Sequence, residues 1–152
     1  MKMSRYGLDV GVPSGFDVRL YRRAAAPGEA TYPILHAGNF ALPQLRGDFG
    51  SGAVEKMGAA HVLVVVVEHG SAAANTALFA SQGRPWLSAA DFDPRRLQRI
   101  VPGQSGAQYF YQESGRAFCL YVVLGSRAQA PSLIGQAQQV LNALTVRPGV
   151  AG

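Results

Sequence analysis

Arginine is the side chain whose number and spacing most clearly indicate binding chemistry in this sequence. Arg95 and Arg99 are four residues apart in a segment predicted to be helical, so both would lie on one face with Arg96 beside them. Two guanidinium groups at that spacing can clamp a carboxylate or a phosphate. Arg19 and Arg23 form a second basic group on a predicted strand. If the two groups meet in the fold, we expect a surface that binds a small anionic ligand.

The alternative for both arginine groups is ordinary pairing at the surface, which is the commoner arrangement. The carboxylates considered as partners are Asp91, Asp93 and Glu29. The formal net charge of +5 and the pI of about 9.8 favour anionic partners in general. The basic residues do not, however, form the dense stripe that is typical of nucleic-acid binders. Nucleic acid is therefore not an expected partner.

The glycine-studded segment LRGDFGSGAVEKMG, residues 45–58, comes just before a long apolar run. Its main-chain amides at Gly50, Ser51 and Gly52 precede a short predicted helix, where an anion could bind. A phosphate-binding P-loop needs lysine and then serine or threonine after its last glycine, but Ala53 and Val54 follow Gly52 here. The glycines are also wrongly spaced for a dinucleotide fingerprint. The favoured interpretation is that they satisfy turn geometry.

Other residue types that carry out catalysis or bind metals do not form a complete set in this sequence. The GQSGA segment, residues 103–107, lies where a predicted helix leads into a strand, the reverse of a nucleophile elbow. His61 and His69 are eight residues apart along a strand, or roughly 26 Å, which is too far to share one ion. Cys119 lies on a strand without an adjacent base. We therefore predict no catalytic residues, no metal and no cofactor.

The composition predicts a chain with a packed interior, because 48% of its residues are hydrophobic and only 15% are charged. One cysteine allows no intrachain disulfide. The longest aliphatic run, residues 62–67, is too short to cross a bilayer. These features predict a cytoplasmic protein, and they leave open an exported form that has lost its leader.

The apolar pattern predicts an α+β fold in a single domain over residues 1–147, with a flexible tail over residues 148–152. The fold is expected to have a mostly antiparallel sheet, with short internal helices and a C-terminal amphipathic helix packed on it. Strands are predicted at residues 6–12, 16–23, 33–40 and 61–70, a hairpin at 107–125 with its turn at 113–116, and helices at 51–57, 93–101 and 131–146. The strand at 61–70 is apolar on both faces, which places it at the centre of the sheet.

The C-terminal order of FCLYVVLGS, a loop and LIGQAQQVLNALTV resembles the ending of small actinobacterial proteins of uncharacterised function. Together with PILHAGNF and GSGAVEKM, it is also similar to Mog/PsbP-like domains, in which helices pack on a sheet. The resemblance carries no catalytic residues and implies a scaffold for binding other proteins. The leading hypothesis is a non-catalytic protein-binding or accessory module. The alternative is a small enzyme or sensor that holds an anionic ligand through its arginines.

Overall fold

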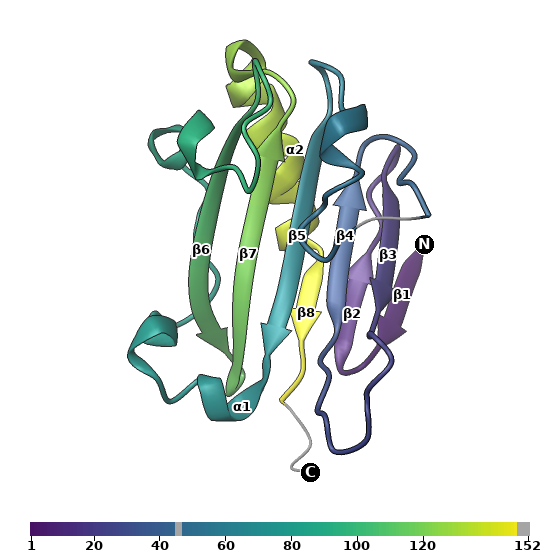
Figure 1. Ribbon diagram of the computed structural model, residues 1–152, viewed down its shortest axis with the longest axis vertical. Coiled ribbons are helices and arrows are strands. Elements are labelled where there is room, and N and C mark those ends of the chain that lie inside the picture. The colour runs from purple at the N-terminus through teal and green to yellow at the C-terminus, as the bar shows by residue number, and fades with distance from the viewer. Residues whose placement is uncertain (45–46, 149–152) are drawn as a thin grey trace.

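A five-stranded antiparallel sheet forms the centre of the molecule. The computed structural model describes residues 1–44 and 47–148. Along the sheet the strand order is β3 (Asp17–Tyr21), β4 (Ile34–Gly38), β5 (Val62–His69), β7 (Arg116–Leu124) and β6 (Ser105–Glu113) (Figure 1). With β5 in the middle and the helices packed around the sheet, the predicted α+β class is confirmed. Of the predicted tail, residues 149–152 lie outside the described part of the chain.

A second, three-stranded sheet covers part of the large one, where the sequence had predicted only one sheet. Its order is β1 (Lys2–Arg5), β2 (Leu8–Gly11) and β8 (Leu144–Val146), and its strand pairs are antiparallel. β1 was not predicted. The predicted helix at 131–146 was wrong at its end, because α2 (Ala130–Asn142) stops before β8 begins. The last three residues of that segment pair instead with β2.

Strand β5 is buried on both faces, as its unbroken apolar sequence predicts. Its residues Val62, Val64 and Val66 belong to a core shared with α2, β2 and β8, and Figure 1 shows α2 behind β5 and β7. On the other face, Leu63 and Val65 belong to a second core that connecting segments complete. We call the first face the helix face and the second the loop face. Because no long helix of the described residues lies on the loop face, short segments must cover it.

The segments over the loop face contain single 3₁₀ turns. The helix predicted at 93–101 was wrong, since only η4 (Pro94–Arg96) is helical and Leu97 is extended and buried. The helix predicted at 51–57 is reduced to η1 (Val54–Lys56). In the first case the chain stays extended because residue 93 exchanges two main-chain hydrogen bonds with Gly106 of β6. The remaining short elements are α1 (Gly70–Ala73), η2 (Ala77–Phe79), η3 (Ala89–Asp91) and η5 (Arg127–Gln129).

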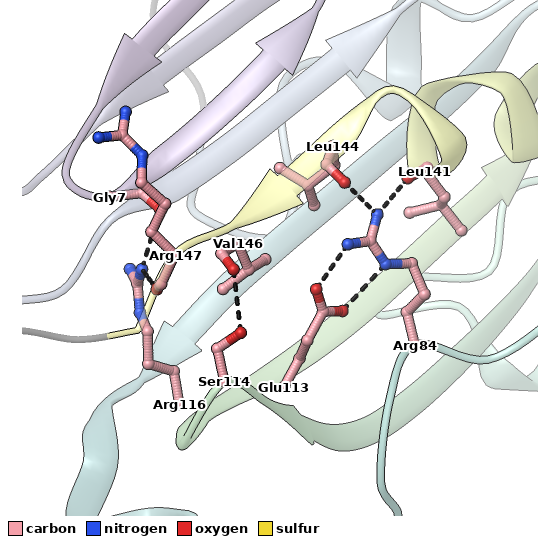
Figure 2. Close-up of polar contacts among 9 residues, drawn as sticks. All are labelled: Gly7, Arg84, Glu113, Ser114, Arg116, Leu141, Leu144, Val146 and Arg147. Atoms are coloured by element: carbon pink, nitrogen blue, oxygen red, sulfur yellow. Dashed lines mark hydrogen bonds and ion pairs between the residues drawn. The ribbon is translucent and has the colours of Figure 1, made fainter.

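The turn between β6 and β7 has the backbone that its sequence predicts. Ser114 and Gly115 have φ angles of +54° and +74°. Two consecutive positive φ angles are typical of the two-residue turns that match the twist of a hairpin. The Ser114 hydroxyl also donates a hydrogen bond to the carbonyl oxygen of Val146 at 2.9 Å (Figure 2). The hairpin turn thus contacts the last strand of the second sheet.

Two arginines fasten the C-terminal segment to this hairpin (Figure 2). Arg84 binds both carboxylate oxygens of Glu113, at 2.9 and 2.6 Å, and donates to the carbonyl groups of Leu141 and Leu144. Arg116 reaches the carbonyl oxygens of Gly7 and Arg147, at 3.2 and 3.0 Å. The carbonyl groups of Leu141, near the end of α2, and of Leu144, at the start of β8, therefore find a donor in Arg84.

Candidate functional site

One arginine from each predicted group reaches the same loop, residues 47–55, on the loop face. Arg23 forms an ion pair with Asp48, with 3.0 Å between Nε and Oδ2. Arg99 forms one with Glu55, with 3.6 Å between the nearest nitrogen and oxygen. Each cation is therefore matched by a carboxylate of the loop. The two groups of arginines are thus connected to one loop through Asp48 and Glu55, and the local charge is balanced.

The other predicted arginines are also engaged at the surface. Arg19 pairs with Asp17 at 3.2 Å, and Arg95 pairs with Asp93 at 3.3 Å. The hydrogen bond between the last two raises the pKa of the Arg95 guanidinium and lowers the pKa of the carboxyl. Arg96 donates to a main-chain carbonyl two residues before Asp93, at 3.0 Å. Surface pairing, the alternative left open by the sequence, is thus what these residues show.

The glycines that precede β5 provide the backbone conformation that the turn requires. Gly50 has a φ of +89°, and a Cβ atom there would lie 2.5 Å from Cδ2 of Leu63. The amide of Gly52 donates to the Glu55 carboxylate at 2.6 Å. A carboxylate already occupies this donor, and Ser51 stands beside it on a segment that leads into only one 3₁₀ turn. The Gly52 amide, one of the three suggested for anion binding, therefore already faces a negative charge of the chain itself.

A hollow of about 350 Å³ lies between this loop, residues 97–99 and the sheet. We call it the loop hollow. Its apolar walls come from Phe49, Val54, Leu97 and Tyr121, and the rings of Phe49 and Tyr121 meet edge to face at 6.4 Å. The Tyr121 hydroxyl accepts a hydrogen bond from the amide of Gln98 at 2.7 Å. Burial raises the pKa of this phenol, so it stays neutral.

Gln104 supplies a buried polar group to the loop hollow. Its side chain is on a residue only 3% exposed, and its Nε2 donates to the carbonyl of Val54 at 2.7 Å. Its other amide atom, Oε1, is buried and has no hydrogen-bond partner in the part of the chain that is described. A buried acceptor without a donor costs free energy, so Oε1 is a local cost within the fold.

The loop that closes the hollow is held in place by Asp48. The Tyr21 hydroxyl donates to its Oδ1 at 3.0 Å, and Arg23 pairs with Oδ2. Its carbonyl oxygen lies 2.7 Å from Nε2 of the buried His36. Three side chains from β3, its C-terminal extension and β4 thus fix one loop residue. This anchoring gives the hollow a preformed shape.

A second hollow, of about 460 Å³, runs beside β6, and we call it the edge groove. It is lined by Arg95, Arg96, Leu97, Gln98, Gln108 and Phe110. β6 is the last strand of the five-stranded sheet, so in the described part of the chain only isolated bridges pair with its outer side. The segment formed by residues 97 and 98 borders both hollows. Arg99 therefore lines the loop hollow, whereas Arg95 and Arg96 line the edge groove.

The main chain of β6 is paired along its outer edge at two points. Gly106 exchanges hydrogen bonds of 3.0 and 3.1 Å with residue 93, and Gln112 bonds to residues 81 and 83 at 2.8 and 2.7 Å. Alternate residues of a strand direct their main-chain groups to the same side, so Gln108 and Phe110 also direct theirs outward. These two residues have no main-chain partner on that side among the residues described. Four main-chain polar groups are thus left without a main-chain partner among the described residues.

The surroundings of the histidines and the cysteine indicate structural roles for these residues. His61 stacks on Phe40 with 5.0 Å between ring centroids. Burial lowers the pKa of His69 and raises the pKa of the Cys119 thiol, which accepts a hydrogen bond from Gln108 at 3.2 Å. Over the described residues, no group of three or more histidine, cysteine or acidic side chains is arranged to hold a metal ion.

No family model, curated protein or solved structure matches this chain. The likeness to Mog/PsbP-like domains and the actinobacterial origin therefore stay predictions. Within the described residues, no helix has the length and apolar character needed to cross a membrane.

Sequence reasoning missed three of the residues that shape these hollows. Gln104 belongs to the GQSGA segment that was weighed for its serine, and nothing in the sequence marks its amide. Gln108 and Phe110 matter through their main chain, and strand order decides which edge is open.

Proposed function

We propose that this protein is a non-catalytic module that binds an extended, acidic segment of another protein along the edge groove. The observation that carries the proposal is the unpaired main chain of Gln108 and Phe110 at the margin of the sheet. Adding a strand to an exposed sheet edge is a recurrent mode of peptide recognition, in which main-chain bonds give affinity. The groove beside this edge provides room for the incoming side chains.

The span of the open edge limits the length of the bound segment. The chain's own pairings at Gly106 and Gln112 close it at both ends. Six residues of a strand cover roughly 20 Å, so about three or four residues of a partner fit between them. Four main-chain bonds at about 0.5–1.5 kcal/mol each contribute roughly 2–6 kcal/mol before the cost of association. Main-chain bonds alone would give weak binding, and side chains must contribute.

The charge of the groove favours acidic side chains in the partner. Arg96 binds a main-chain carbonyl and has no carboxylate partner among the described residues, so it can form an ion pair with a ligand. Arg95 is 86% exposed at its side chain and can exchange Asp93 for a carboxylate of the partner. A guanidinium can bind a carboxylate through two parallel hydrogen bonds. An aspartate or glutamate within the bound segment would thus add affinity and direction.

The test is selection of binders from a library of linear peptides displayed on phage, followed by affinity measurement on the enriched sequences. We expect enrichment of acidic residues and dissociation constants in the micromolar to millimolar range. Gln108→Pro removes an outward amide while leaving the bonds to β7 in place, and it should abolish binding. Arg96→Glu should weaken it at least tenfold, whereas Arg127→Glu, at the exposed start of η5, should not. Peptides that bind the Gln108→Pro variant as tightly as the unaltered protein would contradict the proposal.

The other hypothesis, an enzyme or sensor for an anionic ligand, receives less support. Arg95 and Arg99 line different hollows and are each held by a carboxylate. A small anion would have to displace those carboxylates without the main-chain bonds that a peptide gains.

A further inference from the structure

We propose that Arg5, Tyr6 and Arg22 form a binding site for the phosphate monoester group of a small soluble molecule. We call it the arginine-pair site. It lies at the margin of the molecule formed by β1 and β3, the last strands of the two sheets on the side away from β6 (Figure 1). The edge groove runs beside β6, so this site is separate from it and does not depend on the proposed peptide binding.

The two arginines converge on one ring from the two sheets. Arg5 pairs with Leu8 across the turn between β1 and β2, and Leu8 belongs to the core on the helix face. Directly opposed residues of a strand pair direct their side chains to the same face, so Arg5 points to the side on which the large sheet lies. Arg22 follows the last residue of β3, and its guanidinium carbon lies 5.6 Å from the centre of the Tyr6 ring. The corresponding distance for Arg5 is 4.7 Å, so two cations from different sheets lie around one ring.

The backbone at Tyr6 is unusual for this residue type. Tyr6 and Gly7 have φ angles of +56° and +74° and form the two-residue turn between β1 and β2. Asparagine, aspartate and glycine are the usual residues at the first position of such a turn, since a positive φ is uncommon for a large side chain. Arg116 donates to the carbonyl oxygens of both turn residues, at 3.0 and 3.2 Å, and so fixes the turn from beneath. Turn geometry does not account for a tyrosine here, whereas a platform for two guanidinium groups does.

Arg5 and Arg22 have no carboxylate within ion-pairing distance among the described residues. Glu68 and Asp9, the acidic residues of β5 and β2, are each paired with another arginine. Glu29, in the loop after β3, accepts a hydrogen bond from a main-chain amide three residues earlier at 3.1 Å. Two positive charges are therefore held around one half-buried ring without a counter-ion. Since like charges repel, an anion placed between them would relieve this repulsion.

A phosphate monoester fits both the charge and the donors of the arginine-pair site. It carries about −1.5 to −2 charge at pH 7 and presents three acceptor oxygens. A guanidinium group has its N–H donors in its own plane, so stacking on a ring leaves them available to an oxyanion. Nη2 of Arg22 donates to the carbonyl oxygen of Thr31, which holds this group in place and leaves its other donors for a ligand. A carboxylate ligand carries a single charge and would balance only one of the two arginines.

The small number of cations favours a soluble ligand over a membrane surface. Anionic lipid surfaces are bound by clusters of roughly four to eight basic residues, and this site provides two unpaired arginines. Both arginines are exposed, so solvent weakens their attraction for an anion. We therefore expect binding in the millimolar range for a simple phosphate ester.

The experiment compares phenyl phosphate with benzoate, an aromatic anion of single charge, by two-dimensional NMR of the whole ¹⁵N-labelled protein. We expect phenyl phosphate to shift the Nε–Hε signals of Arg5 and Arg22 and to bind at least about fivefold more tightly than benzoate. Arg5→Gln and Arg22→Gln should each weaken this binding at least about fivefold. The matched Arg127→Gln, at the exposed start of η5, should leave it unchanged. Tyr6→Asn suits the turn but removes the ring, so it should keep the fold and weaken binding about threefold or more.

Three results would overturn the inference: equal affinity for phenyl phosphate and benzoate, shifts confined to arginines other than Arg5 and Arg22, or no saturable shift at millimolar phenyl phosphate. Vesicles of phosphatidylcholine and phosphatidic acid distinguish the source of the phosphate group. We expect the protein not to sediment with them, and sedimentation would place the ligand on a lipid surface and reject the soluble one. Peptides selected for the edge groove should bind the Arg5→Gln variant as tightly as the unaltered protein, so that either proposal can fail alone.

Discussion

Replacement of Arg116 by methionine should remove a large part of the stability of this protein. The guanidinium is on a residue 4% exposed, and it forms an ion pair of 2.5 Å with the buried Glu68. It also donates to the carbonyl oxygens of Tyr6, Gly7 and Arg147, at 3.0, 3.2 and 3.0 Å. One side chain of β7 thus joins β5 to both ends of the described chain.

The expected loss of stability follows from the buried charge that the substitution leaves without a partner. Removing one partner of a buried ion pair costs about 3–5 kcal/mol, because the remaining ion stays buried without compensation. That is a large share of the roughly 5–15 kcal/mol by which a domain is stable. For a domain of this size, the melting temperature should fall by about 6–20 °C. Adding Glu68→Gln removes the unpaired buried charge, so the double variant should be more stable than Arg116→Met alone.

Urea denaturation followed by far-ultraviolet circular dichroism measures these differences. Trp86 is 76% exposed, so tryptophan fluorescence would report unfolding poorly. The matched control is Arg19→Met, which breaks an exposed pair with Asp17 and should cost less than about 1 kcal/mol. If Arg116→Met cost no more than this control, or if Glu68→Gln gave no recovery, the reasoning from burial would be refuted.

Two further predictions concern a glycine and a surface carboxylate. Gly50→Ala should lose roughly 2–5 kcal/mol, from a positive φ and a clash with Leu63, whereas Gly28→Ala, with a φ of +81° and nothing within 4 Å, should lose only about 1–2 kcal/mol. Equal urea midpoints for the two variants would show that the clash with Leu63 does not lower stability. Side-chain hydrogen bonds from Arg147 lower the pKa of Asp9 to about 2. Because this folded-state pKa is depressed, its stabilisation is present above the unfolded value near 3.9 and is lost as pH falls towards 2. Asp9→Asn should therefore lose less stability than the unaltered protein between pH 4 and pH 2, and parallel urea midpoints over that range would contradict this.

The elements that have a long and regular apolar pattern could be predicted from local sequence. The run at 62–69 is apolar on both alternating faces, and it is β5, buried in two cores. The hairpin at 105–124 was predictable because β-branched and aromatic residues flank a Ser-Gly turn. The apolar face of α2 repeats at helical spacing through Leu141. In these segments, burial of many regularly spaced apolar side chains outweighs any competing conformation.

The conformation of the short segments and the composition of the candidate sites depend on long-range contacts. Residues 144–146 could extend a helix, but pairing with β2 and the contact of Arg84 with Leu144 make them a strand. The segment after η4 is extended because Gly106 pairs with residue 93 and Leu97 is buried. Helix propensities differ by only tenths of a kcal/mol per residue, so a few long-range bonds and one buried side chain override them. The open edge at Gln108 and the unsatisfied oxygen of Gln104 arise from strand order and register, which connect residues far apart in the chain and leave no local pattern in the sequence.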